Sequence, residues 1–191
     1  VGTLLARAFH SDGHDVVVLG RLPENREWRT KKWDGKTLGD WAFEIDGSDV
    51  VINLAGRNVN CRYNVENRRQ MMDSRVDSTR VVGEAISNAV NPPRIWLQAS
   101  TATIYAHRFD APNDHVTGVI GGNEPDAPDS WRFSIEVAKA WERTANDSDT
   151  PKTRKLLMRS AMTMSPDRGG IFDVMLDLVR KGLGGTAASG K

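Results

Sequence analysis

Residues 1–21, VGTLLARAFHSDGHDVVVLGR, join a helical pattern to a strand pattern. Apolar side chains recur at helical spacing over the first eight residues, so we expect a helix that ends at Gly13. The apolar run at residues 16–19 then predicts a buried strand, which Gly20 and Arg21 follow. This helix starts without an N-cap residue, so we expect the chain to begin in the middle of a helix.

The rest of the chain continues this alternation of strands and helices. Short apolar runs predict strands at residues 15–20, 28–33, 49–55, 94–100 and 154–160, and amphipathic patterns predict helices at residues 64–89, 130–145 and 171–181. This order predicts the α/β class with a parallel sheet and crossover helices. Residues 107–129, rich in Gly, Pro, Asp and Asn, predict a long functional or mobile loop.

Composition argues against several classes of function. Lys and Arg number 26 against 25 Asp and Glu, so no basic surface for nucleic acid is expected. Cys61 is the single cysteine and the four His residues show no metal-ligand spacing, so we expect neither a disulfide nor a metal site. No apolar run approaches the ~18 residues of a membrane span, and a reducing, cytoplasmic setting fits the cysteine content.

Ligands of an open parallel sheet bind beyond the carboxyl ends of its strands, so the residues that follow each strand are candidates for the site. Arg21 follows the first predicted strand, where an Arg suits the 2′-phosphate of NADP and an acidic residue would suit NAD. The alternative is that Arg21 is a surface cation. Asp34 follows the next strand and could accept a hydrogen bond from an adenine amino group, or could form an Asp-Gly turn with Gly35.

The next two strand ends carry small residues and hydroxyl groups. Ala55 and Gly56 could let a cofactor lie close to the backbone, although a tight turn explains Gly56 equally well. Thr101 and Tyr105 belong to a hydroxyl-rich stretch that could hydrogen-bond a substrate, but such stretches also occur without catalysis. The absence of a GxSxG turn and of a triad order disfavours a serine hydrolase.

Several segments, in order, resemble one family. DVVINLAG (49–56) is similar to the strand-four motif of extended short-chain dehydrogenase/reductases of the sugar-nucleotide epimerase and dehydratase branch, and ASTATIYA (99–106) is similar to their strand-five motif. INLAGRNV, DSRVDSTRVVGEAI, the pair Trp141-Glu142, MSPDRGG and KGLGGTAASGK resemble an atypical subgroup of epimerase-like, NADP-binding proteins of uncertain substrate. The resemblance spans essentially the whole chain. The alternative interpretation, a flavodoxin-like or other nucleotide-binding α/β domain, is therefore much less favoured.

The resemblance implies a Rossmann-like, doubly wound parallel sheet that here lacks its first strand, which would precede residue 1. It implies a cofactor domain over residues 1–165, incomplete at its N-terminal end, and the start of a smaller substrate-binding part over residues 166–191, incomplete at its C-terminal end. Gly2 would be the last glycine of a GxxGxxG loop, and the following helix N-terminus would hold the pyrophosphate. By the same resemblance, Arg21 would meet the 2′-phosphate and Asp34 the adenine, Ala55 and Gly56 would line the cofactor, Thr101 would face the substrate, and Ser160 and Ala161 would lie beside the nicotinamide.

Two departures from the family pattern bear on catalysis. Family members carry Tyr-x-x-x-Lys on the helix after the Ser/Thr motif, where the Lys lowers the pKa of the Tyr phenol. Here those two places fall on Ser134 and Ala138, or on Ile135 and Lys139 in the neighbouring register. Met162 stands where sugar-nucleotide enzymes often carry Asn. Neither register restores the pair, and a UDP-sugar substrate is in doubt.

Two hypotheses about function therefore remain. In the first, the protein is an NADP-dependent epimerase or oxidoreductase that acts on a small carbonyl or sugar-type substrate, with NAD the less favoured cofactor and with Thr101, Tyr105 or Glu136 as the proton donor. In the second, it is a catalytically silent NADP-binding module with a sensor or structural role. The missing Tyr and Lys favour the second, while the cofactor-side pattern fits both. By analogy, the two long predicted helices would form a homodimer interface.

Overall fold

The structure, a computed structural model, describes residues 1–22, 25–165 and 167–186. The chain divides into two compact units, Val1–Arg159 and Ser160–Lys191. The expected boundary at residues 165 and 166, between a cofactor domain and a substrate-binding part, stays a prediction about how these segments divide their functions.

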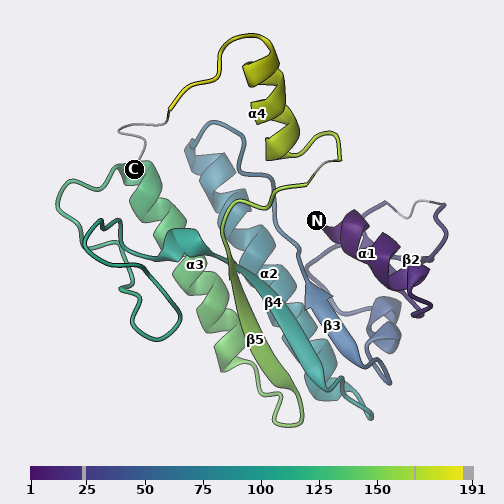
Figure 1. Cartoon of the computed structure of the whole chain (residues 1–191). Helices are drawn as coiled ribbons and strands as arrows, with labels where there is room; N and C mark the ends of the chain where they lie inside the picture. Colours follow the sequence, from purple (N-terminus) through teal and green to yellow (C-terminus); the bar gives the residue numbers. More distant parts are fainter. Residues whose placement is uncertain (23–24, 166, 187–191) are drawn as a thin grey trace. The chain divides into compact units, whose positions relative to one another are not determined.

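In the described part of the chain, the strands form two separate sheets (Figure 1). β1 (Val17–Gly20) pairs in parallel with β2 (Arg29–Lys32). β3 (Val50–Asn53) pairs in parallel with β4 (Ile95–Thr101), and β5 (Arg154–Ser160) lies on the other side of β4. The α/β class with parallel pairing is confirmed. Among the described residues, no ladder joins β1 to β3.

Local signals account for the bounds of the helices. α1 (Gly2–Ser11) ends just before Gly13, whose φ of 87° favours glycine. α2 (Val65–Asn88) begins where the Asn64 side chain accepts a hydrogen bond from the backbone N–H of Asn67 at 2.8 Å, as an N-cap does. α3 (Asp129–Asp147) directly follows Pro128. All three helices fall within two residues of the predicted bounds.

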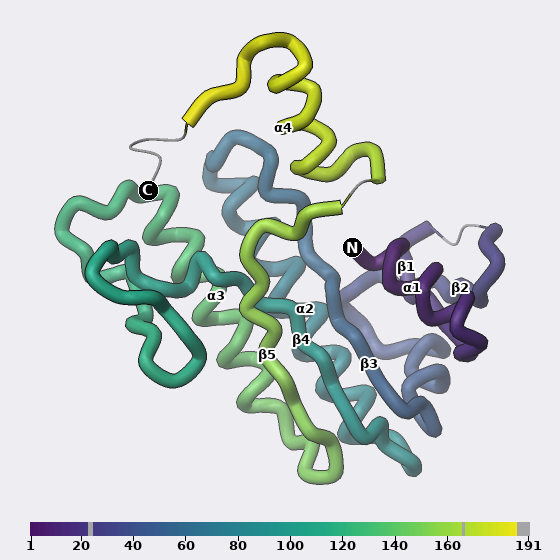
Figure 2. The backbone as a smooth tube through the Cα atoms, viewed as in Figure 1, coloured from purple at the N-terminus to yellow at the C-terminus, as the bar shows by residue number. Residues whose placement is uncertain are grey.

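α2 and α3 pack against each other and cover the same face of the β3-β4-β5 sheet (Figures 1 and 2). Apolar side chains from the helices and strands meet in one core cluster there, whose buried members are Trp33, Trp41, Ile45, Val51, Val81, Val82, Ala85, Ile86, Trp96 and Ala145. Trp96, the second residue of β4, is fully buried. This packing fixes the carboxyl ends of β3 and β4 against α2 and α3, where the candidate residues lie.

The predicted long loop is confirmed as a segment without regular structure. Residues 107–128 contain no helix and no strand beyond a one-residue bridge between Tyr105 and Ile120. The second unit contains α4 (Ile171–Arg180), which follows Gly170 and ends within one residue of the predicted position. None of the helices that the structure describes has the length and apolar character needed to cross a membrane.

Candidate functional site

The register of the paired strands places predicted residues next to one another at the carboxyl ends of the strands in both sheets. Gly20 of β1 pairs with Lys32 of β2, and the backbone N–H of Trp33 donates to the Gly20 carbonyl oxygen at 2.9 Å. Arg21 and Asp34 therefore leave the first sheet close to each other. In the second sheet, Asn53 pairs with Gln98. Residues 55–56 and 100–101, each two to three positions further along, therefore lie at the same edge of this sheet.

Arg21 presents an exposed guanidinium at its strand end. Within residues 1–22, 25–165 and 167–186, no hydrogen bond or ion pair occupies this side chain. An exposed Arg that is free of a carboxylate can form charge-assisted hydrogen bonds to a phosphate. Its assignment to the 2′-phosphate stays a prediction, which the geometry permits.

Asp34 forms the Asp-Gly turn. Its Oδ1 accepts the backbone N–H groups of Lys36 at 2.8 Å and Thr37 at 3.0 Å, and its Oδ2 accepts the Thr37 hydroxyl at 2.6 Å. Gly35 has a φ of 76°, which this turn requires. The Thr37 hydroxyl, followed by the two backbone N–H groups, lowers the pKa of Asp34 to about 2.

The turn does not use all of the acceptor capacity of this carboxylate, since two oxygens provide about four lone-pair directions. A cavity of about 310 Å³ lies beside it, lined among others by Lys31, Trp33 and Trp41. The adenine contact of Asp34 therefore stays a prediction alongside the turn.

Gly2 and Ala55 lie close to the carboxyl end of β3. A Cβ added to Gly2 would lie 3.7 Å from Cδ1 of Leu54, so the first turn of α1 approaches this strand end. The backbone N–H of Ala55 donates to Oδ1 of Asn53 at 3.0 Å, and Nδ2 of Asn53 donates to Oε1 of Gln98 at 3.0 Å. Asn53 and Gln98 are buried, so these bonds fix the path of the chain as it leaves β3.

Gly56 contacts the helical layer of the fold. A Cβ added at this position would lie 3.2 Å from Cζ of Arg75 on α2 and 3.4 Å from its Nη2. The tight contact with the Arg75 guanidinium therefore gives a reason for glycine at residue 56 that does not involve a cofactor. The cofactor-lining role of Ala55 and Gly56 stays a prediction.

Thr101 and Tyr105 flank the short helix η2 (Ala102–Ile104). The Thr101 hydroxyl accepts the Thr103 backbone N–H at 3.2 Å and donates to the Thr103 hydroxyl at 3.0 Å. The Tyr105 hydroxyl accepts a hydrogen bond from Nη1 of Arg159 at 2.9 Å, and the guanidinium lies 5.0 Å from the centre of the Tyr105 ring. Both residues are half-buried; Thr101 is the last residue of β4, and Tyr105 comes four residues later.

The comparisons with known proteins can be set beside this geometry. The sequence model of the NAD dependent epimerase/dehydratase family matches residues 1–125. The chain belongs to this family. Similar proteins include the epimerase family protein SDR39U1 of Mus musculus, at 27% identity, and the epimerase family protein SERP0438 of Staphylococcus epidermidis, at 30%. Each match covers all of this chain and 60% of the relative, so the chain spans about three fifths of these proteins.

Solved structures agree with the family. The crystal structure of human epimerase family protein SDR39U1 (isoform 2) with NADPH superposes with a TM-score of 0.80 at 27% identity, covering 99% of this chain and 59% of that one. A nucleoside-diphosphate sugar epimerase from Corynebacterium glutamicum gives a TM-score of 0.73 at 23% identity over all of this chain and 37% of that one, which shows the fold alone. The Rossmann-like fold of this epimerase-family chain is thereby confirmed.

The residues predicted to stand at the positions of the family's Tyr and Lys lie on α3. Ile135 and Ala138 are fully buried, and the Ser134 hydroxyl donates to the carbonyl oxygen of Ser130. The Lys139 ammonium donates to the carbonyl oxygen of Gly121 at 2.8 Å. Glu136, the third candidate proton donor, is exposed on α3.

Two other predicted residues lie at the start of the second unit. Ser160 ends β5 and Ala161 follows it, and both are exposed. Their place beside the nicotinamide stays a prediction. Across the described ranges, no group of His, Cys, Asp and Glu residues is arranged to hold a metal ion.

The structure also places Tyr105 in a polar cluster with three residues that the sequence analysis did not assign to the site, Ser100, Glu142 and Arg159. Glu142 on α3 is 6% exposed and accepts two hydrogen bonds from Arg159, at 2.8 Å each, and one from the Ser100 hydroxyl. The hydrogen bonds to Glu142, and then to Tyr105, raise the pKa of Arg159. This Ser100–Glu142–Arg159–Tyr105 cluster joins β4, α3 and β5. In the sequence, Ser100 and Tyr105 belong to the ASTATIYA segment and Glu142 to the Trp141-Glu142 pair, whereas nothing singled out Arg159.

Proposed function

We propose that this epimerase-family protein binds NADP across the carboxyl ends of β1, β3 and β4. The observation that carries the proposal is Arg21, an exposed guanidinium with no described partner at the end of β1. The human SDR39U1 structure that contains NADPH supports the same choice of cofactor, whereas other neighbours contain NAD. NADP is the proposed cofactor, and NAD is the alternative.

The residues at these strand ends fit a dinucleotide. The first turn of α1 has neither a side-chain cap nor an acidic residue, so its N–H groups can face a diphosphate. Arg21 would hold the 2′-phosphate, and the remaining acceptor directions of Asp34 would meet the adenine. The Asn53–Gln98 bond holds Ala55 and Gly56 in place beside the expected path of the dinucleotide.

The catalytic part of the proposal concerns the hydroxyls at and just after the carboxyl end of β4. A bound nicotinamide would supply hydride transfer at its ring. Thr101 would hydrogen-bond a carbonyl or hydroxyl of a small carbonyl or sugar-type substrate. Tyr105, held by Arg159 at 2.9 Å, would exchange a proton in place of the missing Tyr of Tyr-x-x-x-Lys, with Thr101 and Glu136 as alternatives.

A second candidate function is a silent NADP-binding module. The observation that favours it is that Ala138 and Ile135 are fully buried where the family carries its Lys or Tyr. In either case the expected partner is a small molecule, and a cytoplasmic setting and a homodimer through α2 and α3 remain proposals.

Calorimetric titration of the full-length protein with NADPH and NADH tests the cofactor proposal. We expect NADPH to bind about 10- to 100-fold more tightly, because charge-assisted hydrogen bonds contribute about 1.5–3 kcal/mol. Arg21→Asp should abolish that preference. Lys152→Asp, an exposed cation just before β5 and so at the amino end of the sheet, should keep it. Equal affinities in the unmodified protein would reject the assignment.

Turnover separates the enzyme from the module. The protein is incubated with NADPH and a panel of carbonyl compounds and sugar nucleotides, and the absorbance of the reduced nicotinamide is followed. Turnover that falls about 10²- to 10⁴-fold in Thr101→Val supports the enzyme. Tight NADPH binding without turnover of any panel member supports the module.

A further inference from the structure

Residues 106–121, the first part of the long loop, fold back to the point where they leave η2. Tyr105 and Ile120 form an antiparallel bridge, and the backbone N–H of Gly121 donates to the Ile104 carbonyl oxygen at 2.9 Å. The two ends of the loop are therefore joined to each other directly beside Tyr105. A change in the position of either end would reach this tyrosine through the backbone.

The Tyr105 ring contacts both this loop and the Arg159 guanidinium. A Cβ added to Gly118 would lie 2.5 Å from Cε1 and 3.0 Å from Cδ1 of the ring. The guanidinium lies 5.0 Å from the ring centre and donates to the hydroxyl at 2.9 Å. Any side chain at residue 118 would displace the ring or the loop, so the loop backbone limits how far the ring can move.

Lys139 attaches this loop to α3. Its ammonium donates to the carbonyl oxygen of Gly121, at the closing end of the loop, at 2.8 Å. A Cβ added to the next residue, Gly122, would lie 3.3 Å from the same ammonium, so the backbone passes close to it. In residues 1–22, 25–165 and 167–186, the half-buried Lys139 has no carboxylate partner and this carbonyl is its hydrogen-bond acceptor.

Side-chain packing between the base of the loop and α3 is incomplete near Lys139. A cavity of about 330 Å³ is lined there, among others, by Ile104, Ile120, Lys139 and Arg143. Ile120 remains 37% exposed. Because apolar contacts do not fill this space, the Lys139 hydrogen bond is a main part of the attachment of the loop to the helix.

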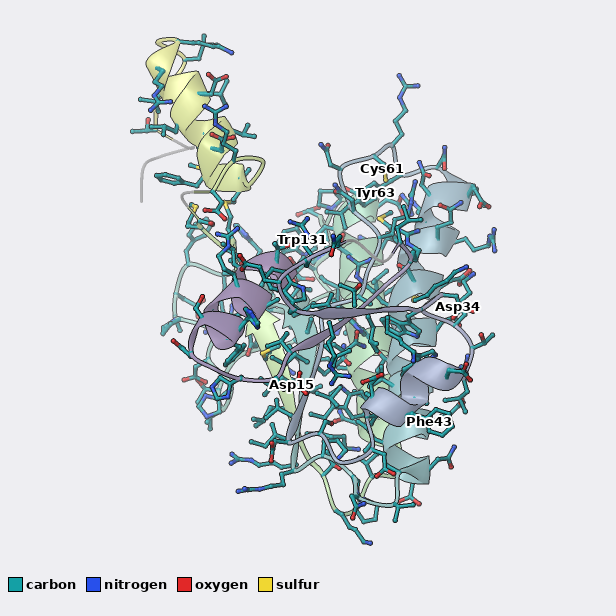
Figure 3. The ribbon with its side chains drawn as sticks, turned by 90° about the vertical axis from the view of Figure 1, so that its right-hand side faces the viewer. Asp15, Asp34, Phe43, Cys61, Tyr63 and Trp131 are labelled. Atoms are coloured by element: carbon teal, nitrogen blue, oxygen red, sulfur yellow. The ribbon has the colours of Figure 1, made fainter. Side chains whose placement is uncertain are left out.

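The loop lies at the end of the first unit that carries the candidate site. His107, at its start, packs edge-on against Trp131 in the first turn of α3, with ring centres 6.3 Å apart. Trp131 lies toward the same end of the first unit as Cys61 and Tyr63, which follow β3 (Figure 3). The loop therefore borders the region beyond the strand ends, where the proposed function places the substrate.

We propose that Lys139 is a positioning residue for Tyr105: by holding the Gly121 carbonyl on α3, it keeps the loop, and through Gly118 the Tyr105 ring, against Arg159. This inference rests on the proposed function in taking Tyr105 as the proton donor. One register of Tyr-x-x-x-Lys also falls on Lys139. The role proposed here differs from the role of the family's Lys, because Lys139 acts through a loop carbonyl and not through a contact with the cofactor.

The first test compares variants of the full-length protein. Lys139→Met keeps most of the stem but removes the N–H donors, and Lys139→Arg restores a donor. Arg143→Met is the matched control, because Arg143 is an exposed cation one turn further along α3 with no hydrogen bond among the described residues.

These variants are compared on a panel substrate that the protein turns over. We expect Lys139→Met to lower kcat about 10- to 100-fold with unchanged NADPH affinity, because a displacement of about 1 Å at a reacting group has an effect of this size. Lys139→Arg should recover most of kcat, and Arg143→Met should leave it unchanged. An unchanged kcat in Lys139→Met, or a 10-fold loss of NADPH affinity, would overturn the proposal.

The second test needs no turnover, because it observes Tyr105 directly. The ring signals of Tyr105 in the NMR spectrum are assigned with Tyr105→Phe. We expect Lys139→Met and Gly118→Ala to shift them, since these substitutions act on the loop at two different points, and we expect Lys139→Arg to restore them. Arg143→Met should leave them in place. Tyr105 signals that do not move in Lys139→Met would show that Lys139 does not position this ring.

Failure of the proposed function gives a different result. If Tyr105→Phe keeps full turnover, or if no panel member is turned over, Tyr105 is not the proton donor. Tyr105 signals that still shift in Lys139→Met and return in Lys139→Arg would then retain the positioning of the ring. Turnover that depends on Tyr105 but not on Lys139, with unmoved ring signals, would retain the proposed function and reject the role of Lys139.

Discussion

Arg159 and Glu142 form a two-point ion pair in which Nε and Nη2 of the arginine each lie 2.8 Å from one carboxylate oxygen. The Glu142 side chain is 8% exposed and that of Arg159 is 26% exposed, so the pair is mostly removed from water. It connects α3 to the end of β5 and, through Arg159, holds the Tyr105 hydroxyl. The position of a candidate proton donor therefore depends on a buried carboxylate on another element.

Removal of this carboxylate should destabilise the fold. Glu142→Gln keeps the size of the side chain but leaves the Arg159 charge without its partner, and we expect a loss of about 3 kcal/mol in the free energy of unfolding. Chemical denaturation measures it. Glu66→Gln, which breaks an exposed ion pair on α2, should have no measurable effect. Equal changes in the free energy of unfolding for the two substitutions would show that the Glu142–Arg159 pair does not stabilise the fold.

The turn at Asp34 predicts a pH dependence at acid pH. The pKa of Asp34 is lowered from 3.8 to about 2 in the folded chain, so its stabilising effect is complete above about pH 4 and is lost as the pH falls towards 2. NMR titration of the carboxyl carbon should give a pKa near 2 in the unmodified protein. Thr37→Val removes the largest cause of the shift and should move the pKa towards 3.8, while Thr144→Val on α3 should leave it unchanged. A pKa near 3.8 in the unmodified protein would contradict the observed turn.

The contact between Gly56 and Arg75 predicts a substitution effect that depends on both residues. Gly56→Ala places a Cβ 3.2 Å from Cζ of Arg75, and we expect a loss of about 1 kcal/mol in stability. In an Arg75→Ala background the same change should cost almost nothing, which a double-mutant cycle measures. Gly20→Ala is the matched control, because its added Cβ would meet only the Leu22 carbonyl oxygen at 3.8 Å. If Gly56→Ala costs as much stability in the Arg75→Ala background, the loss would come from the backbone conformation at residue 56 and not from the contact with Arg75.

The elements of the fold could be predicted because their signals are local. Asn64 caps α2 through a bond to Asn67 only three residues away, and Gly13 ends α1 with a φ of 87°. The residue-by-residue register of the strands could not be predicted from such signals, because strand pairing joins segments that are distant in sequence. The register of Val50 with Ile95, for example, spans the whole of α2.

The strand-end residues were predicted from the order of the elements, but their contacts were not. Asp34 showed two possible roles in the sequence, and the structure forms the turn while leaving the adenine contact a prediction. Gly56 was predicted as a cofactor-lining residue, and the structure adds a contact to Arg75, 19 residues away on α2. The Glu142–Arg159 pair joins residues 17 positions apart on a helix and a strand, a separation that follows no periodic pattern.

The central claim is that NADP lies across the carboxyl ends of β1, β3 and β4 with its 2′-phosphate on Arg21. A crystal structure of the full-length protein with NADPH tests this most directly. The account predicts phosphate oxygens at about 2.7–2.9 Å from the Arg21 guanidinium and the nicotinamide on the side of Thr101. A dinucleotide bound elsewhere, or a 2′-phosphate in solvent away from Arg21, would contradict it.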